Sequence, residues 1–263
     1  MVQGYIDAAT HCGARSYQQD RFVVHRIRQG KEKGWLLAVA DGHGDSAEVA
    51  EFCEKNLADY FTKFIGKAKS ITNEAHKNVI KSTVKTLSDL TKNMDSGSTL
   101  SLVYISETKG MAFVGILGDS PIIIRGRKGS LIISPEHNAR TNLAERKAAT
   151  KRGAIYSGGY IWDDPQSDMR SGLQLTRALG NKKLARFISR KPEIYSVNLG
   201  PDSFVVVMSD GVVDPGHKDP DTISHNLASL IENGATAADL VNDALKRRTG
   251  DNVTTVLWKQ PKP

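Results

Sequence analysis

The sequence predicts an α+β fold, because helical patterns occur in pairs between blocks of short antiparallel strands. The two helical pairs span residues 46–92 and 221–248, where apolar residues recur every three or four positions. Between them, four apolar segments follow one another within residues 99–134 at hairpin spacing, which indicates antiparallel pairing. No repeat and no Pro/Gly-rich linker divides the chain, so we expect a single domain over residues 1–263.

The composition is that of an ordinary globular protein. Hydrophobic residues make up 39% and charged residues 25%, and 263 residues suffice for a substantial core without cross-links. The two cysteines, Cys12 and Cys53, show neither zinc-site spacing nor a disulfide pattern, so a reducing, cytoplasmic setting is expected. The first residues lack the features of a signal peptide, and no run of about 18 apolar residues predicts a membrane span. We expect a soluble monomer without membrane contact.

Excess basic charge is the one unusual feature of the composition. The formal net charge is +7 and the pI is about 9.3, a balance that can indicate nucleic acid or another anionic partner. The basic residues are scattered, however, and their local concentrations at residues 26–33, 63–69, 146–152 and 182–191 lack the interleaving of aromatic residues that a binding strip would have. We interpret them as solvated surface and expect no specific nucleic-acid partner, although the same charge would favour acidic or phosphorylated protein substrates.

The first part of the chain predicts strands followed by a helical pair. Residues 2–10 and 21–28 are expected as strands, and residues 35–40 as a buried strand because they form a short, uninterrupted apolar run. Residues 46–65 and 73–92 are expected as helices. Since the connection between them is short, we expect the two helices to lie antiparallel against a sheet.

The rest of the chain alternates short strands with shorter helices. We expect a helix over residues 142–152, ended by Gly153, and an irregular surface flap near the site over residues 156–174, where Gly-Gly and Asp-Asp-Pro interrupt any periodicity. The remaining predicted elements are the helices 221–232 and 236–248 and the strands 99–106, 111–117, 121–125, 130–134, 204–209 and 253–258.

An Asp-Gly turn follows the buried strand at residues 35–40. Residues 41–44 are Asp-Gly-His-Gly, and two glycines within three residues let backbone and side-chain oxygens crowd around a ligand. A hard cation would suit this turn, since Asp41 offers a charged oxygen and the Gly42 carbonyl an uncharged one. An isolated Asp-Gly more often makes only a tight turn, in which Asp accepts a backbone hydrogen bond. Repetition of the pattern elsewhere favours the cation.

Further aspartates stand at the ends of other predicted strands. Asp210 and Asp119 each follow an apolar segment, and Asp251 and Asp20 each precede one. Carboxylates at strand ends can converge in space although they are far apart in the sequence. An aspartate cluster without accompanying Cys or His pairs favours Mg²⁺ or Mn²⁺ over zinc. The sequence therefore predicts a shared site for these cations.

Taken in order, these segments resemble the metal-dependent type 2C (PPM) serine/threonine protein phosphatases. Each segment alone is a weak signal, but seven in the family's order make a specific one. The resemblance covers nearly the whole chain and implies two antiparallel β-sheets in a central sandwich with helices on both outer faces, that is, α/β/β/α layers. The matching segments are residues 15–20 (RSYQQD), 41–44 (DGHG), 96–99 (SGST), 118–120 (GDS), 175–180 (LTRALG), 209–211 (SDG) and 250–252 (GDN).

The resemblance implies hydrolysis of phosphoserine and phosphothreonine monoesters in phosphorylated protein substrates, such as the targets of a cognate kinase. It also implies two Mn²⁺ or Mg²⁺ ions per active site and a weaker third. Two such ions offset the phosphate charge and make a bridging water acidic enough to attack as hydroxide. In this scheme Asp41 bridges the two ions and Gly42 contributes its carbonyl to one. Asp210 and Asp251 complete the other ion's site, and Asp20 holds a bound water.

Two further residues are assigned to the substrate by the same resemblance. Arg15 matches the family's phosphate-binding arginine, and its planar guanidinium can hold two phosphate oxygens at once. His43 is the candidate general acid that would protonate the leaving seryl or threonyl oxygen, since imidazole titrates in a useful range. The alternatives are an ordinary surface arginine and a histidine that only completes a turn.

Three more residues are expected to support the cations. Asp119 matches a position that helps to hold the third ion together with Asp210, although a simple turn aspartate is the alternative. Asn252 is expected to fix Asp251 or a water beside it. Gln19 stands where many members of the family have Glu, and it keeps hydrogen bonding to water.

Two other departures from the family pattern lie outside the predicted ligands. Pro121 replaces the usual Arg after Gly-Asp-Ser, and Asn181 replaces the usual Asp after Ala-Leu-Gly. We therefore expect an intact site. Two alternatives stay open: a catalytically weak regulatory or scaffold protein of the same fold, and a phosphatase of this fold that acts on a non-protein phosphate ester.

Overall fold

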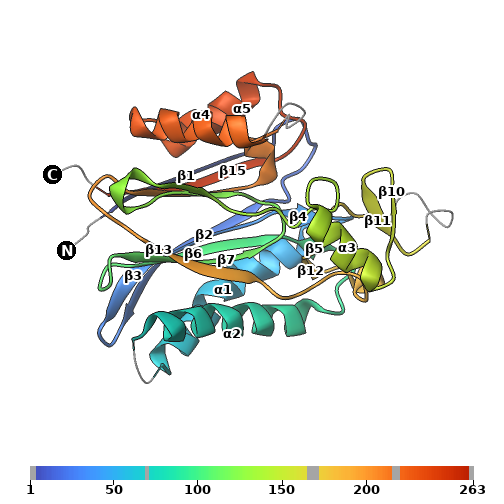
Figure 1. Cartoon of the computed structure of the whole chain (residues 1–263), viewed down its shortest axis with the longest axis horizontal. Helices are drawn as coiled ribbons and strands as arrows, with labels where there is room; N and C mark the ends of the chain where they lie inside the picture. Colours follow the sequence, from blue (N-terminus) through green and yellow to red (C-terminus); the bar gives the residue numbers. More distant parts are fainter. Residues whose placement is uncertain (1–3, 69–70, 165–171, 215–219, 261–263) are drawn as a thin grey trace.

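The computed structural model describes residues 4–68, 71–164, 172–214 and 220–260. Two five-stranded antiparallel sheets lie face to face, and a pair of helices covers the outer face of each (Figure 1). This arrangement confirms the predicted α/β/β/α sandwich. Within the described ranges, no helix has the length and hydrophobicity needed to cross a membrane.

Each sheet combines strands from distant parts of the chain. The first has the order β1-β15-β14-β8-β9 and the second β13-β7-β6-β3-β2. Their strands are β1 (Tyr5–His11), β2 (Arg21–Gln29), β3 (Glu32–Ala40), β6 (Leu100–Ser106), β7 (Met111–Leu117), β8 (Ile122–Arg125), β9 (Leu131–Ile133), β13 (Glu193–Asn198), β14 (Phe204–Met208) and β15 (Val253–Lys259).

Several shorter elements lie beyond one end of the two sheets (Figure 1). Three two-residue strands form a small sheet in the order β12-β5-β4, and two three-residue strands form a separate hairpin, β10-β11. These strands are β4 (Gly42–His43), β5 (Gly97–Ser98), β10 (Ile155–Ser157), β11 (Tyr160–Trp162) and β12 (Leu179–Gly180).

Branched apolar side chains fill the space between the sheets. Leu37 and Val39 of β3 belong to one buried cluster with Val205 and Val207 of β14. Helices cover the other face of the same strand, so residues 36–40 are all buried. Burial on both faces explains why this strand reads as an uninterrupted apolar run rather than an alternating one.

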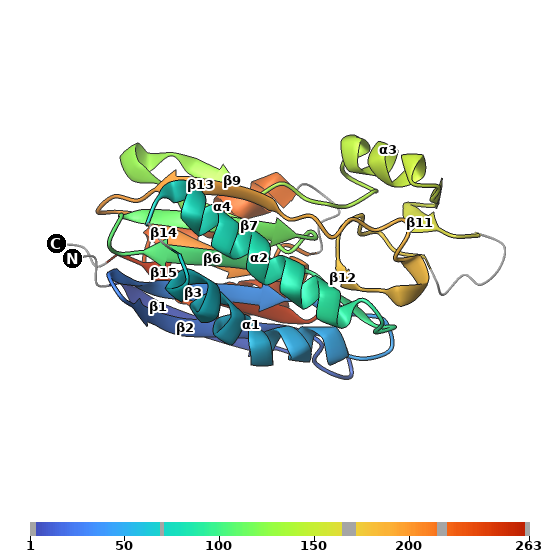
Figure 2. The same cartoon turned by 90° about the horizontal axis from the view of Figure 1, so that it is seen from below.

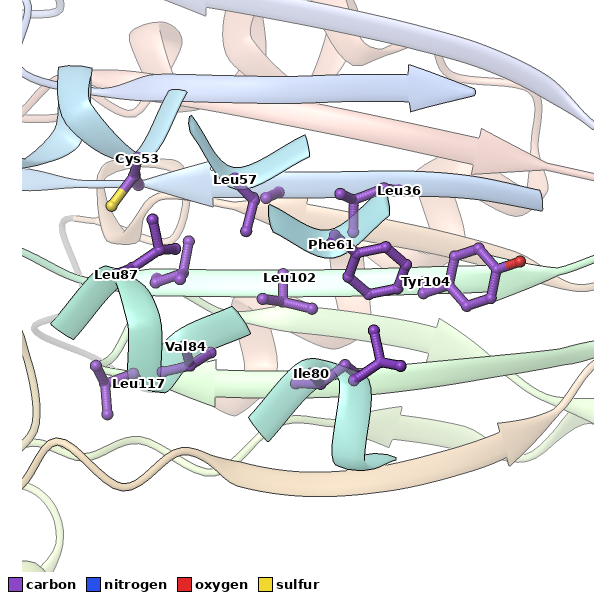
Figure 3. Packing of buried hydrophobic residues seen from close by; sticks show 14 of the residues in the cluster. Leu36, Cys53, Leu57, Phe61, Ile80, Val84, Leu87, Leu102, Tyr104 and Leu117 are labelled. Carbon is purple, nitrogen blue, oxygen red and sulfur yellow. The ribbon is translucent and has the colours of Figure 1, made fainter. Parts of the chain in front are cut away.

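The helices α1 (Glu48–Gly66) and α2 (Asn73–Thr91) pack side by side on the outer face of the second sheet (Figure 2). Their inward side chains include Leu57, Phe61 and Leu87, which pack with side chains of β3 and β6 (Figure 3). The predicted antiparallel pair against a sheet is therefore present, and its apolar stripe has the three- and four-residue spacing seen in the sequence.

The outer face of the first sheet is covered by α4 (Pro220–Glu232), which packs on β8, and α5 (Ala237–Lys246), which packs on β1 and β15. Leu227 and Leu240 belong to one buried cluster with apolar side chains of β14. A further helix, α3 (Leu143–Lys151), lies apart from both pairs (Figure 1). It packs instead with the β10-β11 hairpin beyond the ends of the sheets. The short elements next to α3 thus form a separate layer at one end of the molecule.

One strand connection differs from the expected hairpins. β7 and β8 are consecutive in the chain, yet they belong to different sheets, because the chain turns at Gly118 and crosses the sandwich. Gly118 has a φ of +120°, which a residue with a side chain rarely adopts. Spacing alone cannot tell such a crossing from a hairpin, and here the crossing places residues 118–120 at the end of both sheets.

Other strands also differ from the sequence expectation. β13 was not predicted; it pairs with β7 at the edge of the second sheet, where half-burial leaves no clean alternation in its sequence. The β10-β11 hairpin lies within the stretch 156–174 that was expected to be irregular. Residues 165–171 of that stretch lie outside the described residues.

Candidate active site

The predicted aspartates come together because antiparallel neighbours run in opposite directions. Asp20 precedes β2 and Asp41 follows β3, and the register Arg21↔Ala40 makes them neighbours at the same sheet end. Asp210 follows β14 and Asp251 precedes β15, so the first sheet brings them together in the same way. In each pair, the residue that follows one strand therefore lies beside the residue that precedes the neighbouring antiparallel strand.

Removal from water and mutual repulsion raise the pKa of these carboxyl groups. Desolvation raises the pKa of Asp20 to about 6, opposed by hydrogen bonds with Ser209 and Thr254. It also raises the pKa of Asp119 to about 6. For Asp41 the pKa lies well above the usual value, because of desolvation first and then the charges of Asp210 and other aspartates.

The same two causes apply to Asp210. Desolvation is the larger, and the charges of Asp119 and Asp251 add to it, so the pKa again lies well above the usual value. The charge of at least one other carboxylate therefore raises the pKa of each of these aspartates. The negative charges of such a cluster of carboxylates repel one another, and a bound divalent cation would offset this repulsion.

The donor set fits a hard cation in two further respects. Asp20 is 4% exposed and its Oδ2 is buried without a hydrogen-bond partner. Gly42 allows close approach of the β4 backbone, since a Cβ there would lie 2.7 Å from the Gln19 carbonyl oxygen. Within the described ranges, no three His, Cys, Asp or Glu side chains already form a metal-ligand set. The carboxylates thus share one region without meeting at one point.

Arg15 lies at the mouth of this region. Its Nη2 donates to Asp251 Oδ2 at 2.8 Å and its Nε donates to the Gly250 carbonyl at 3.1 Å. Half of the side chain stays exposed, and it lines a pocket of about 560 Å³ together with Asp119, Asp210 and Asp251. The pocket is open, and carboxyl groups line it together with two guanidinium groups, those of Arg15 and Arg140, which suits a phosphate that arrives with cations present.

His43 lies on β4, next to Asn181. Its Nε2 is 2.8 Å from Asn181 Oδ1, an acceptor, which places the ring proton on Nε2. Desolvation lowers the pKa of His43, and hydrogen bonds with Asn181 and the Asp41 backbone oppose the shift. Gly97 makes room for this pair, because a Cβ there would lie about 2 Å from both polar atoms.

Asn252 ties the loop that carries Arg15 to the strand ends. Its Nδ2 donates to the carbonyls of Cys12 and Tyr17, each at 2.9 Å, and its Oδ1 accepts from the Gln19 amide at 2.9 Å. The Asn252 amide itself donates to Asp251 Oδ1 at 2.8 Å. The side chain therefore positions the loop, while the backbone positions the aspartate.

A family model described as protein phosphatase 2C matches residues 7–253. The chain belongs to the protein phosphatase 2C family. All the segments that carried the resemblance in the sequence lie within this match.

Plant relatives show the same family over nearly the whole chain. The chain is 26% identical to "Probable protein phosphatase 2C 52" of Oryza sativa over 94% of its own length and 48% of the relative's. It is 27% identical to "Probable protein phosphatase 2C 69" of Arabidopsis thaliana over 95% of its own length and 68% of the relative's. The chain thus spans about half of one and two thirds of the other.

Solved structures of the type 2C fold are similar in shape. A serine-threonine phosphatase 2C from Toxoplasma gondii superposes with a TM-score of 0.74 at 18% identity, over 99% of this chain and 96% of that one. A C. elegans sex determining protein gives 0.78 at 20% identity, over 98% and 65%. At such identities the likeness concerns the fold.

Two residues of this type 2C site were not assigned a role from the sequence. Asn181 was noted only as a departure from the family pattern, yet it contacts His43. Asn138 donates from Nδ2 to Asp119 Oδ2 at 2.7 Å and lies at the same pocket. No sequence pattern marks Asn138, because its contact depends on how the loop after β9 folds back onto the strand ends.

Proposed function

We propose that this chain is a protein serine/threonine phosphatase, one domain over residues 1–263, that hydrolyses phosphoserine and phosphothreonine monoesters. The observation that carries the proposal is the pocket in which Arg15 borders Asp119, Asp210 and Asp251. Family membership supports it, and the presence of every predicted carboxylate disfavours a scaffold role. Cytoplasmic location, a monomeric state and phosphoproteins made by a cognate kinase belong to the same proposal.

The aspartates would hold the cations of the family, Mn²⁺ or Mg²⁺. We assign Asp41, with the Gly42 carbonyl, and Asp210, Asp251 and Asp20 to two of these ions. Asp119, held by Asn138, would serve a weaker third. When bound, the ions would offset the phosphate charge and lower the pKa of a water molecule. The carboxylates themselves determine where the cations would bind, which is at the pocket that Asp119, Asp210 and Asp251 line.

Arg15 binds and orients the phosphate in this proposal. Its guanidinium lines the pocket and keeps free donors while it contacts Asp251, so it can hold two phosphate oxygens beside the aspartates. Asn252 and Gln19 hold the loop that carries Arg15 at a fixed distance from Asp251. Orientation of the ester is thus set by a loop pinned to the strand ends.

His43 holds the proton that the leaving oxygen requires. In the present arrangement its Nε2 proton is directed to Asn181, so donation to a seryl or threonyl oxygen requires this hydrogen bond to break. An alkoxide is a poor leaving group, which makes the proton valuable for a phosphopeptide and of little use for an aryl ester.

The test is phosphate release from a phosphothreonine peptide by the purified chain. We expect hydrolysis in manganese or magnesium buffer, loss of hydrolysis in chelator and recovery when the metal is restored. Hydrolysis that survives thorough chelation, or no hydrolysis under any of these conditions, would contradict the proposal.

A further inference from the structure

The net charge of the chain is confined to one segment. Residues 136–192 contain 12 of the 36 Lys and Arg and 5 of the 29 Asp and Glu. The rest of the chain has 24 of each, so it is formally neutral and the whole excess of +7 belongs to this basic segment. A charge confined in this way creates a local field, whereas the same charge spread over the surface would largely be screened.

The basic segment borders the candidate active site. It contains α3 and the β10-β11 hairpin, which lie beyond the ends of the sheets (Figures 1 and 2), and η2 (Lys182–Leu184), whose Leu184 belongs to the same buried cluster as side chains of α3 and β11. Arg140 lines the pocket that holds Asp119 and Asp210. Lys182 directly follows Asn181, the partner of His43. Positive charge therefore begins at the edge of the pocket.

Most of this charge is exposed and not neutralised by neighbours. Two arginines of the segment are paired, Arg177 with Glu145 and Arg186 with Asp163. In the part of the chain that the structure describes, no salt bridge involves six other exposed cations of the segment. They are Arg140, Lys147, Lys151, Lys182, Lys183 and Lys191.

A packed base holds the segment in place. Ala149 of α3 packs with Leu184 and Phe187 in a buried cluster, and Arg152 Nε donates to the Phe187 carbonyl at 2.6 Å. With its apolar side turned inward, α3 leaves Lys147 and Lys151 exposed. The cations are thus carried by an ordered support rather than by a loose tail, which lowers the entropic cost of binding to them.

We propose that the exposed cations of the basic segment bind acidic residues that flank the phosphorylated residue of the substrate, and so select acidic phosphopeptides. The inference rests on the proposed function. A phosphopeptide whose phosphate enters the pocket must cross its rim, where Arg140 is placed to meet a carboxylate near the phosphate. Lys182 and Lys183 are placed to meet others along η2.

Nucleic acid is the competing anionic partner, and the site disfavours it. A continuous polyanion crossing the pocket would meet the aspartates at its base, whereas a peptide brings one phosphate there and carries its other charges at a distance. Two aromatic rings of the segment are also engaged: the Arg146 guanidinium lies 4.1 Å from the Tyr156 ring centroid, and Phe187 is buried. Base stacking needs free ring faces.

The first experiment compares two phosphothreonine peptides of equal length, one flanked by Asp and Glu and one by Lys and Arg. Phosphate release by the full chain is measured in manganese buffer. We expect kcat/KM to be about tenfold or more higher for the acidic peptide at low ionic strength, and the advantage to shrink at about 0.5 M salt. Equal kcat/KM values overturn the inference while the proposed function stands; no release from either peptide contradicts the proposed function itself.

The second experiment reverses two charges of the segment. Lys182→Glu/Lys183→Glu should reduce the advantage of the acidic peptide by about tenfold. The matched control Lys55→Glu/Lys81→Glu makes the same change of charge at exposed positions of α1 and α2 and should leave the advantage intact. An equal loss in the control would show that net charge alone is responsible, and the inference would be wrong.

Two additional measurements separate peptide selection from a folding defect and from nucleic-acid binding. If thermal melts show that the η2 variant is unfolded, Lys147→Glu/Lys151→Glu on α3 makes the same test, with the same expected loss. Fluorescence anisotropy with a single-stranded oligonucleotide tests the alternative partner. Tight binding at physiological salt that the charge reversal abolishes, combined with no discrimination between the peptides, would assign the segment to nucleic acid and overturn the inference.

Discussion

At the level of single residues, the aspartates lie close enough for their negative charges to repel one another. The pKa values of Asp41 and Asp210 lie well above the usual value, with desolvation as the larger cause and neighbouring carboxylates as the second. Such groups add little to stability by themselves, since each charged form is disfavoured in the folded chain. Their arrangement is explained by the positive charge that they can attract. Stability and catalysis should therefore respond in opposite directions when one charge is removed.

Asp210→Asn is the sharpest test of this opposition. Phosphopeptide hydrolysis should fall by at least about 100-fold, more than the 10–100-fold typical of residues that only support a ligand. The thermal midpoint in chelator should stay equal or rise, because the amide no longer repels Asp119 and Asp251. Asp202→Asn, at an exposed loop position, is the control and should change neither quantity. Near-normal turnover of the Asp210 variant would show that the ligand assignment is wrong.

Arg15 is expected to act mainly on substrate binding. Arg15→Ala should raise KM for a phosphopeptide about tenfold, and Arg15→Lys should recover only part of the loss, since a single ammonium cannot hold two phosphate oxygens in a fixed plane. Steady-state kinetics would show this, with Arg28→Ala at an exposed strand position as the control. An unchanged KM would mean that Arg15 serves only as the partner of Asp251.

His43 is expected to act on the leaving group. His43→Gln should lower turnover of a phosphopeptide by roughly 10² to 10⁴, the range of general acid catalysis, and that of para-nitrophenyl phosphate much less. The aryl ester has an acidic leaving phenol and hardly needs the proton. His25→Gln, an exposed histidine of β2, is the control. Equal losses on both substrates would indicate that His43 only positions its neighbours.

At the level of elements, the sequence predicted what local periodicity encodes. The helices α1 and α2 and the buried strand β3 were predicted because their apolar spacing follows directly from burial on one face or on two. The edge strand β13 and the crossing from β7 to β8 were not predicted, since the pairing of these strands depends on segments that are distant in the chain. The same holds for the site. The aspartates could be recognised in the sequence because they stand at the ends of predicted strands, whereas the contact of Asn181 with His43 depends on the folding of distant segments and could not.

Buried charge ties the β2-β3 hairpin to α2 at the end of the second sheet opposite the site. Glu32 is 2% exposed and accepts from the Tyr104 hydroxyl at 2.7 Å and the Ser106 hydroxyl at 3.1 Å, and it lies 3.2 Å from His76 Nε2. Burial acts to raise the pKa of Glu32, but its hydrogen-bonding partners outweigh burial, so the pKa is lowered. The contact is thus strongest in the ionised state.

Glu32→Gln should lower the free energy of unfolding by about 1–3 kcal/mol near pH 7, because buried donors lose a charged acceptor. Since the folded-state pKa is lowered, this stabilisation is present above the unfolded-state pKa of about 4.3 and is lost as the pH falls through the folded-state pKa. Urea denaturation at pH 7 and in acid should show the difference between wild type and variant shrinking. Glu48→Gln, at an exposed position, is the control, and an equal loss there would contradict the assignment.

At the level of the whole molecule, the candidate site is where the two sheets are joined. Asp20 and Asp41 flank strands of the second sheet, and Asp210 and Asp251 flank strands of the first. Asp119 lies in the crossing between them. The start of β1 and the end of β15 lie at the opposite end of the sandwich (Figure 1). Cations held by all five aspartates would therefore connect the two layers, and binding should stabilise the domain as a unit rather than one loop.

Manganese should accordingly raise the thermal midpoint of the chain. At about 100 times the dissociation constant, binding to the folded state alone contributes about 2.7 kcal/mol. In a chain of this size that corresponds to a rise of about 5–10 °C, measured by calorimetry in manganese and in chelator. The rise should be largely lost in Asp210→Asn and kept in Asp202→Asn. If manganese gave no rise, or if Asp210→Asn showed the full rise, the aspartates could not be the residues that hold the cations, and the link between the two sheets would have to depend on packing alone.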